Sequence, residues 1–397
     1  MTTKITSLLF LFLTVLSLNA QGVRFESSLS AALEKGKKEN KPVFIEYYNE
    51  NCSVCKTLNP IFEDPAMGDF YNTHFVNYRM NTENIKKEDS LYIVQSKLKL
   101  ESVPYFLFFD SDNTLIHCSG AKADANYLIN TVGKTALDPE ERTANLAKKY
   151  VSGDKSIRTL YAYSNLVQLY KDERMVNRIA NDLYDAFPKD QLATQKSYTL
   201  LKNCVFSIDN GFFTYWVNNI DKLKDFETGY KAGTEIKVLQ EILLKTINSD
   251  AKNSWNLAKI KSVKELIEKT GLSTNPDAYL WQQEAAVLIK EGREPEAVAL
   301  FNKMTDNETV AGATYVINQF LDIVKEKNSF AVIKSKIEAL RNSTHDNDDK
   351  ADLLYTELRY WQKINNKDEL KKLLIKANTF YKTNQLDLAR LNEFKVN

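Results

Sequence analysis

The stretch VFIEYYNENCSVCK, residues 43–56, places two cysteines just after a compact apolar run. The run from Pro42 to Tyr48 has the length and the β-prone composition of a buried strand. The segment from Cys55 to Phe62 has the apolar spacing of a helix. The stretch therefore predicts a strand, a short connection and a helix, with Cys52 and Cys55 at the start of that helix.

A Cys-x-x-Cys pair admits three interpretations: half of a zinc site, a buried structural pair or a redox centre. A zinc site needs about four ligands, and outside this pair the chain has only Cys118, Cys204 and three histidines. The redox interpretation is favoured because the unpaired N–H groups and the dipole of a helix N-terminus stabilise a thiolate. We predict that Cys52 is the exposed, low-pKa nucleophile and Cys55 the buried resolving thiol.

The sequence around the pair alternates between strand-like and helix-like patterns. Besides the elements named above, it predicts helices over 25–38, 90–98 and 123–131 and strands over 75–80, 105–109 and 114–118. This order implies a mixed sheet flanked by helices.

Beyond residue 137 the strand patterns stop, and 137–397 is predicted to be all-α. Asp138-Pro139-Glu140-Glu141 has the capping Asp, the first-position Pro and the acids of a helix start. One segment has the spacing of a tetratricopeptide helical hairpin, carried by Trp281, Ala285, Leu288, Gly292, Ala297 and Phe301. Glu284 occupies a position that is usually Leu in that motif. A helical-hairpin repeat and a plain helical bundle both remain open.

Residues 21–136 resemble the thioredoxin family. Pro60, five residues after Cys55, corresponds to the proline that kinks the active-site helix of that family, and Val103-Pro104 is similar to its cis-proline dipeptide. The run CSVCK, followed by IFEDP at 61–65, resembles the periplasmic C-terminal domain of DsbD and related modules. The resemblance implies an α/β thioredoxin fold with a mixed central sheet.

The resemblance also implies roles for individual residues. Protein disulfides would be the substrates, bound in a groove formed by Val103, Pro104, Ser53 and Val54. Glu46 lies where the family has a buried Asp, so it is expected to exchange a proton with Cys55 at a pKa raised by burial. The alternative is a structural Glu at a strand end. No cofactor and no metal are implied.

Three departures from the family pattern bear on function. Asn51 replaces the Trp before the first cysteine, and Ser53-Val54 replaces the Gly-Pro of thioredoxin itself. The direction of electron flow therefore stays open, although the DsbD resemblance favours reduction or isomerisation. Arg79 replaces a family Lys near the buried acid and is expected to be a surface charge.

The only other cysteine in the strand-bearing half is Cys118, which follows His117 in the last predicted strand. Neighbouring side chains of a strand point to opposite faces of the sheet. We therefore expect a core cysteine beside a surface histidine, not a Cys-His nucleophile.

Residues 1–20 have the layout of a secretory signal peptide. Lys4 precedes an apolar run from Leu8 to Leu18, and Ala20 offers a small residue at the cleavage point. About 11 apolar residues are too few to span a bilayer, which takes about 20. We predict secretion across the inner membrane into the periplasm, with no membrane span after cleavage.

Two functional hypotheses follow. The first is an extracytoplasmic thiol–disulfide oxidoreductase that acts on protein disulfides and depends on a redox partner protein. The second is an interaction protein whose helical domain binds a partner and whose thioredoxin-like domain is structural. A formal net charge of +1 gives no electrostatic footprint for nucleic acid.

Overall fold

The computed structural model describes residues 22–100, 103–227, 229, 231–344 and 346–394. The predicted signal peptide lies outside these residues. The chain divides into two compact units, Met1–Tyr215 and Trp216–Asn397. The predicted fold class is confirmed: a mixed sheet flanked by helices is followed by an all-helical region. In the ranges just given, no helix is both long and apolar enough to cross a membrane.

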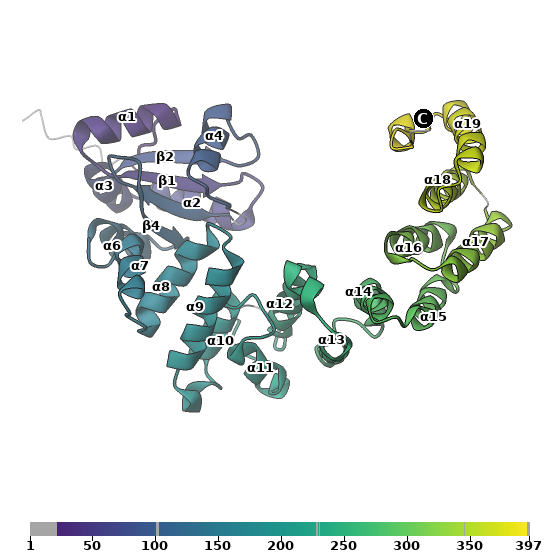
Figure 1. The fold of residues 1–397 in the computed structure, drawn as a ribbon. Coiled ribbons are helices and arrows are strands. Elements are labelled where there is room, and N and C mark those ends of the chain that lie inside the picture. Colours follow the sequence, from purple (N-terminus) through teal and green to yellow (C-terminus); the bar gives the residue numbers. More distant parts are fainter. Residues whose placement is uncertain (1–21, 101–102, 228, 230, 345, 395–397) are drawn as a thin grey trace, which may run out of the picture. The chain divides into compact units, whose positions relative to one another are not determined.

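The sheet of the N-terminal unit has four strands in the order β2-β1-β3-β4 (Figure 1). They are β1 (Val43–Tyr48), β2 (Val76–Asn81), β3 (Tyr105–Phe109) and β4 (Leu115–Gly120). Strand β1 is parallel to β2 and antiparallel to β3, and β3 is antiparallel to β4. All four predicted strands are confirmed, with ends that moved by at most two residues.

The helices around the sheet follow the sequence less closely. They are α1 (Leu29–Glu39), α2 (Ser53–Phe62), α3 (Pro65–His74), α4 (Lys87–Gln95), α5 (Ala125–Tyr127), a π-helical turn (Leu128–Gly133) and α6 (Lys134–Leu137). Helix α3 was not expected, although its start is clear in the sequence: the Asp64 side chain accepts from the N–H of Ala66 at 2.7 Å, and Pro65 takes the first helical position. The helix predicted over 123–131 is divided among α5 and the π-helical turn.

Apolar side chains fill both faces of the sheet. The α2-side core consists of Phe44, Leu58, Phe62, Met67, Tyr71, Phe75, Phe106, Phe108, Ile116, Leu128, Val132 and Ala136. The α8-side core consists of Leu29, Ala32, Val43, Ile45, Val76, Tyr78, Met80, Leu98, Leu107, Phe109, Cys118 and Leu169. Alternation along β1 divides its side chains between the two cores. The second core includes Leu169, which lies well beyond the sheet in sequence.

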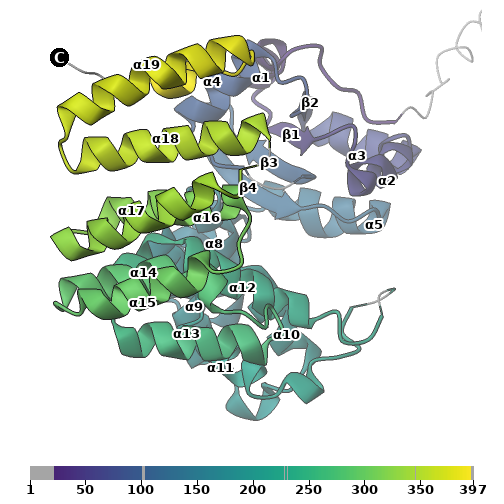
Figure 2. The same cartoon turned by 90° about the vertical axis from the view of Figure 1, so that its right-hand side faces the viewer.

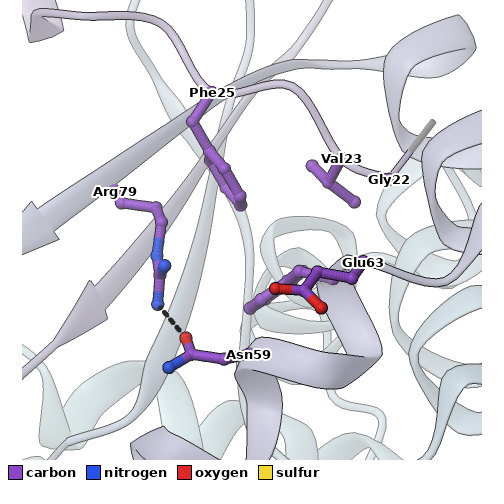
Figure 3. Close-up of a pocket in the computed structure, with 7 residues that line it drawn as sticks. Gly22, Val23, Phe25, Asn59, Glu63 and Arg79 are labelled. Atoms are coloured by element: carbon purple, nitrogen blue, oxygen red, sulfur yellow. Dashed lines mark hydrogen bonds between the residues drawn. The ribbon is translucent and has the colours of Figure 1, made fainter.

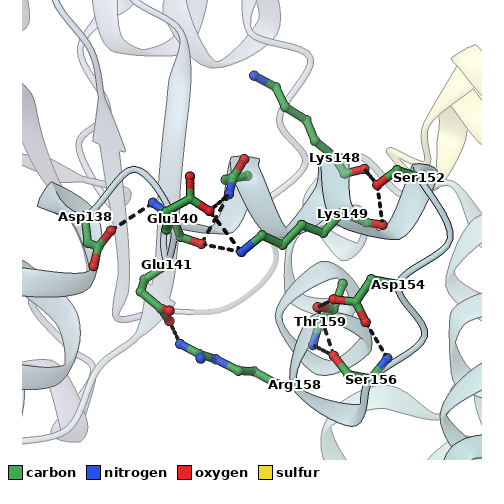
Figure 4. Close-up of polar contacts among 11 residues, drawn as sticks. Asp138, Glu140, Glu141, Lys148, Lys149, Ser152, Asp154, Ser156, Arg158 and Thr159 are labelled. Atoms are coloured by element: carbon green, nitrogen blue, oxygen red, sulfur yellow. Dashed lines mark hydrogen bonds and ion pairs between the residues drawn. The ribbon is translucent and has the colours of Figure 1, made fainter.

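The connection from α6 to the next helix differs from the prediction (Figure 4). Helix α7 (Thr143–Val151) begins five residues later than Asp138, which was expected to cap it. The backbone N–H of Asp138 bonds to carbonyls at the end of α6, and its side chain accepts from the N–H of Glu140 at 2.8 Å. Asp138 therefore closes a turn after α6 instead of starting a helix.

The first helical segment after this turn protects the edge strand β4. The Thr143 hydroxyl lies 3.4 Å from both the N–H and the carbonyl oxygen of Cys118, and 2.7 Å from Nδ1 of His117. The N–H of Thr143 donates to the same ring nitrogen at 3.2 Å. An open strand edge would leave these groups unpaired. Helices α7 and α8 (Ile157–Gln168) thus pack beside β4 as part of the N-terminal unit.

The remaining helices are α9 (Glu173–Ala186), α10 (Gln195–Cys204), α11 (Gly211–Val217), α12 (Ile236–Asn248), α13 (Leu257–Lys269), α14 (Asp277–Lys290), α15 (Glu294–Thr305), α16 (Val310–Ile323), α17 (Lys327–Arg341), α18 (Asn347–Lys363) and α19 (Lys367–Thr383). Helices α14 to α19 run as antiparallel hairpins in the C-terminal unit (Figure 2). The described residues of 137–397 contain no strand.

The predicted hairpin motif coincides with α14 and α15. Trp281, Ala285, Leu288, Ala297 and Phe301 are all buried in one core. Gly292 ends α14 at a φ of +74°, a left-handed conformation that favours glycine. The carboxylate of Glu284, at the position that departs from the motif, is paired with Lys264 of α13. A neighbouring helix thus satisfies the charge at that position.

Replacing Thr143 by Val should destabilise the N-terminal unit by about 2 kcal/mol, because the buried edge of β4 loses the hydroxyl that pairs with it and the His117 ring loses one of its two polar contacts with Thr143. The measurement is hydrogen exchange of β3 and β4 peptides against urea concentration. Thr73→Val is the control, since the exposed Thr73 hydroxyl bonds only within its own helix, and should change stability by no more than about 0.5 kcal/mol. Equal effects of the two substitutions would contradict the edge-capping role of Thr143.

Candidate functional site

Cys52 lies at the N-cap of α2. Its sulfur accepts a hydrogen bond from the N–H of Cys55 at 3.2 Å, and helical geometry begins at Ser53. Cys52 is partly exposed, whereas Cys55, one turn into the helix, is 2 % exposed. Both are free thiols. Pro60 lies inside the same helix, as the sequence implied.

The two thiols have pKa values that move in opposite directions. Burial alone would raise the pKa of Cys52, but hydrogen bonds from the Cys55 side chain and from the N–H groups of Cys55 and Val54, with the charge of Lys56, bring it below its ordinary value. Burial raises the pKa of Cys55 to about 11, and its hydrogen bond to Cys52 adds to that. A thiolate therefore forms at Cys52 first.

The Val103–Pro104 peptide bond is cis and lies beside Cys52. The thiol of Cys52 approaches the Val103 carbonyl oxygen at 3.8 Å. Val54 is 52 % exposed on the same helix start as Cys52. These contacts bring together the cysteines and the residues that the sequence resemblance assigned to a substrate groove.

Glu46 is fully buried beneath α2. It lies two residues after Phe44 and so faces the α2-side core. Burial raises its pKa to about 7, against the opposing effect of Arg79. Its Oε1 atom has no hydrogen-bond partner among the described residues. Its charge contributes to the raised pKa of Cys55, so the two groups are electrostatically coupled.

Arg79 is not the surface charge that the sequence suggested. It lies directly opposite Glu46 in the β1–β2 register, and its Nε donates to Oε2 of Glu46 at 2.5 Å. The guanidinium also donates to Asn59 of α2 at 2.9 Å and lies 4.3 Å from the centroid of the Tyr48 ring. Arg79 is therefore fixed between the buried acid and the active-site helix.

A pocket of about 430 Å³ opens beside this arginine (Figure 3). Its lining consists of Gly22, Val23, Phe25, Asn59, Phe62, Glu63 and Arg79. Sequence reasoning did not assign Asn59 to the site. Its position four residues after Cys55, on the same face of α2, is a signal that could have identified it.

The loop before Cys52 is held by polar contacts to the end of β2. Asn51, which occupies the position of the family Trp, donates to Glu83, and Asn81 donates to Glu50 at 2.9 Å. The polar residue at position 51 thus anchors the loop instead of presenting an aromatic surface.

The pair His117 and Cys118 is wholly buried, which corrects the expectation of a surface histidine. His117 packs against Phe108 and accepts a hydrogen bond from Thr143, and burial lowers its pKa to about 4. Cys118 lies on the other face of the sheet, in the α8-side core. The two side chains are not a nucleophile–base pair.

Comparison with known proteins agrees with this geometry. Residues 24–134 match the Thioredoxin family, so this part of the chain is a thioredoxin domain. The match supports a thiol–disulfide role in general terms. No curated protein matches the chain.

Three solved structures that resemble the chain cover between 27 % and 30 % of it. The DsbH oxidoreductase is 20 % identical, with a TM-score of 0.26 and coverage of 29 % of this chain and 85 % of its own. A protein described as a disulphide-isomerase from Bacteroides thetaiotaomicron is 28 % identical, with a TM-score of 0.26 and coverage of 30 % and 95 %. The disulphide isomerase from Xylella fastidiosa Temecula1 is 16 % identical, with a TM-score of 0.19 and coverage of 27 % and 84 %.

The raised pKa of Glu46 predicts that the free energy of unfolding depends on pH. Folded Glu46 holds its proton up to about pH 7 and the unfolded side chain only to its ordinary value of 4.5. The contribution of Glu46 to stability is therefore fully present below pH 4.5 and is lost as pH rises from 4.5 through 7, by about 3 kcal/mol in total. Glu46→Gln, which keeps an acceptor for Arg79, should remove this loss.

The measurement is the difference in unfolding free energy between wild type and Glu46→Gln at pH 5 and pH 8, from hydrogen exchange of β1 peptides in urea. Comparing the two proteins cancels the titration of other groups, including His117. A difference that does not change with pH would show that Glu46 titrates normally.

Proposed function

We propose that this protein is an extracytoplasmic thiol–disulfide oxidoreductase that acts on protein disulfides through Cys52 and Cys55. The observation that carries the proposal is the asymmetry of the pair: a partly exposed thiol with a lowered pKa at a helix N-terminus, and a buried thiol with a raised pKa one turn later. A purely structural pair of cysteines would not require thiols that differ in exposure and in pKa.

The proposed reaction begins with attack by the Cys52 thiolate on one sulfur of a substrate disulfide. The substrate S–S bond breaks, its second sulfur leaves as a thiolate that takes a proton, and a mixed disulfide forms at Cys52. Cys55 then gives its proton to the carboxylate of Glu46 and attacks the Cys52 sulfur. The mixed disulfide breaks, the substrate sulfur that was bound to Cys52 leaves as a thiolate that takes a proton from water, and a disulfide joins Cys52 to Cys55.

Glu46 suits the role of proton acceptor because its pKa is close to neutral and its Oε1 atom is not engaged by another group among the described residues. Val103 and Pro104, with Ser53 and Val54, would line the substrate groove. A redox partner protein must return two electrons to the Cys52–Cys55 disulfide for the next cycle.

We place the protein in the periplasm on the strength of the signal peptide predicted for residues 1–20. The reductase or isomerase direction is preferred on the DsbD resemblance. The alternative is an interaction protein whose thioredoxin domain is structural. It predicts that the protein has no disulfide-reducing activity that depends on Cys52 and Cys55, and the experiments below distinguish the two functions.

The mature protein should catalyse reduction of insulin disulfides with dithiothreitol as the terminal reductant, and Cys52→Ser should lower the rate to the uncatalysed level, because the serine hydroxyl cannot form the mixed disulfide. Turbidity of the released insulin chains reports the rate. Cys204→Ala removes a buried cysteine of α10 and should leave the rate unchanged. Equal rates for wild type and Cys52→Ser would contradict the enzymatic role.

Cys55→Ser should accumulate mixed disulfides at Cys52, because the resolving thiol is absent. Non-reducing electrophoresis of periplasmic extracts, followed by mass spectrometry of the captured chains, detects them and identifies the substrates. Cys52→Ser/Cys55→Ser is the matched control and should capture nothing. Capture at Cys118 or Cys204 in place of Cys52 would contradict the assignment of the nucleophile.

A further inference from the structure

Helix α8 lies outside the matched thioredoxin domain, yet its last turn contacts the segment that leads to Pro104. The carbonyl oxygen of Leu169, at the C-cap of α8, accepts a hydrogen bond from the N–H of Lys99 at 2.6 Å. The Leu169 side chain is 5 % exposed and belongs to the α8-side core together with Leu98. This end of α8 is thus fixed both by its backbone and by its side chain.

The same helix contacts the segment on the other side of Pro104. Tyr105 directly follows Pro104, begins β3 and packs against the α8-side core, as does Leu166 of α8. Burial is the main cause of the strongly raised pKa of Tyr105, and nearby Cys118 and Tyr161, the latter on α8, add to it. The Tyr105 hydroxyl also hydrogen bonds to the Cys118 thiol.

These contacts lie on either side of Val103 in the sequence, at Lys99 and at Tyr105. Between the two anchors lies the Val103 carbonyl, 3.8 Å from the sulfur of Cys52. The first anchor is Lys99, whose N–H bonds to the Leu169 carbonyl at the end of α8. The second is Tyr105, which packs against the same core as Leu166 and Leu169. Helix α7 packs against α8, and its first residue, Thr143, accepts a hydrogen bond from the edge of β4.

We propose that Leu169 and Leu166 of α8 are positioning residues for the Val103–Pro104 side of the redox site, so that the functional unit extends to α8. This inference rests on the proposed function for its effect on turnover. Truncating these side chains should make the backbone at Lys99 and Tyr105 more mobile. A protein substrate that must lie against Val103 and Pro104 then binds less well. The reactivity of Cys52 toward a small reagent depends on α2 and should not change.

The test uses the full-length mature chain with Leu169→Ala, and with Leu166→Ala as a milder second variant because Leu166 is only half-buried. Val43→Ala is the control. Val43 belongs to the same core but lies at the end of β1 farthest from Cys52. Truncations of buried aliphatic side chains lower stability by similar mechanisms, so the control accounts for a general loss.

In Leu169→Ala the amides of Lys99 and Tyr105 should exchange about tenfold faster than in wild type, while Val43→Ala leaves them unchanged relative to the rest of β3. The KM for insulin should rise about tenfold in Leu169→Ala, with alkylation of Cys52 by iodoacetamide within about twofold of wild type. Leu166→Ala should show the same pattern to a smaller degree.

Unchanged exchange at Lys99 and Tyr105 in both leucine variants, or the same increase in Val43→Ala, would overturn the proposal. A fall in iodoacetamide reactivity equal to the loss of turnover would also overturn it, because the effect would then act on Cys52 itself. If wild type fails to reduce insulin, the proposed function fails, and the exchange measurements still decide whether α8 positions this segment.

Discussion

The placement of β1 between β2 and β3 is the constraint on which the proposed redox site depends. The inner position of β1 pairs both of its edges, and the two apolar cores cover both of its faces, so Glu46 is buried on the α2 side with no exposed surface. The same strand ends just before the loop that places Cys52 at the N-cap of α2. One strand thus fixes the positions of both Glu46 and Cys52.

The cost of burying Glu46 is partly offset by Arg79, its neighbour across the β1–β2 register. A buried carboxylate without any partner would be neutral well above pH 7, whereas a strong, fully formed ion pair would keep it ionised. Glu46 lies between these limits, since one oxygen accepts from Arg79 and the other accepts from no described group. That balance gives a pKa of about 7, which suits proton exchange with a thiol.

The helices after residue 137 are not a separate addition to the sheet. Thr143 satisfies the open edge of β4, and Leu169 contributes to the core on one face. The compact N-terminal unit continues to Tyr215 and so includes the first helices after residue 137. A free strand edge and an uncovered apolar face are both unfavourable in water, so the first helices of the extension complete what the thioredoxin domain leaves open.

The sequence by itself determined the four strands, the place of Cys52 and Cys55 at a helix start, and the all-helical character of the second half. Apolar periodicity and capping are local properties, so a sequence shows them directly. It also pointed to Glu46 and to the cis dipeptide at Val103-Pro104 through the family resemblance. Only the tertiary structure decided that Arg79 joins Glu46 to Asn59, that His117 is buried, and that the C-terminal end of α8 contacts Lys99. Each of these depends on contacts between residues 20 or more positions apart, which no local pattern encodes.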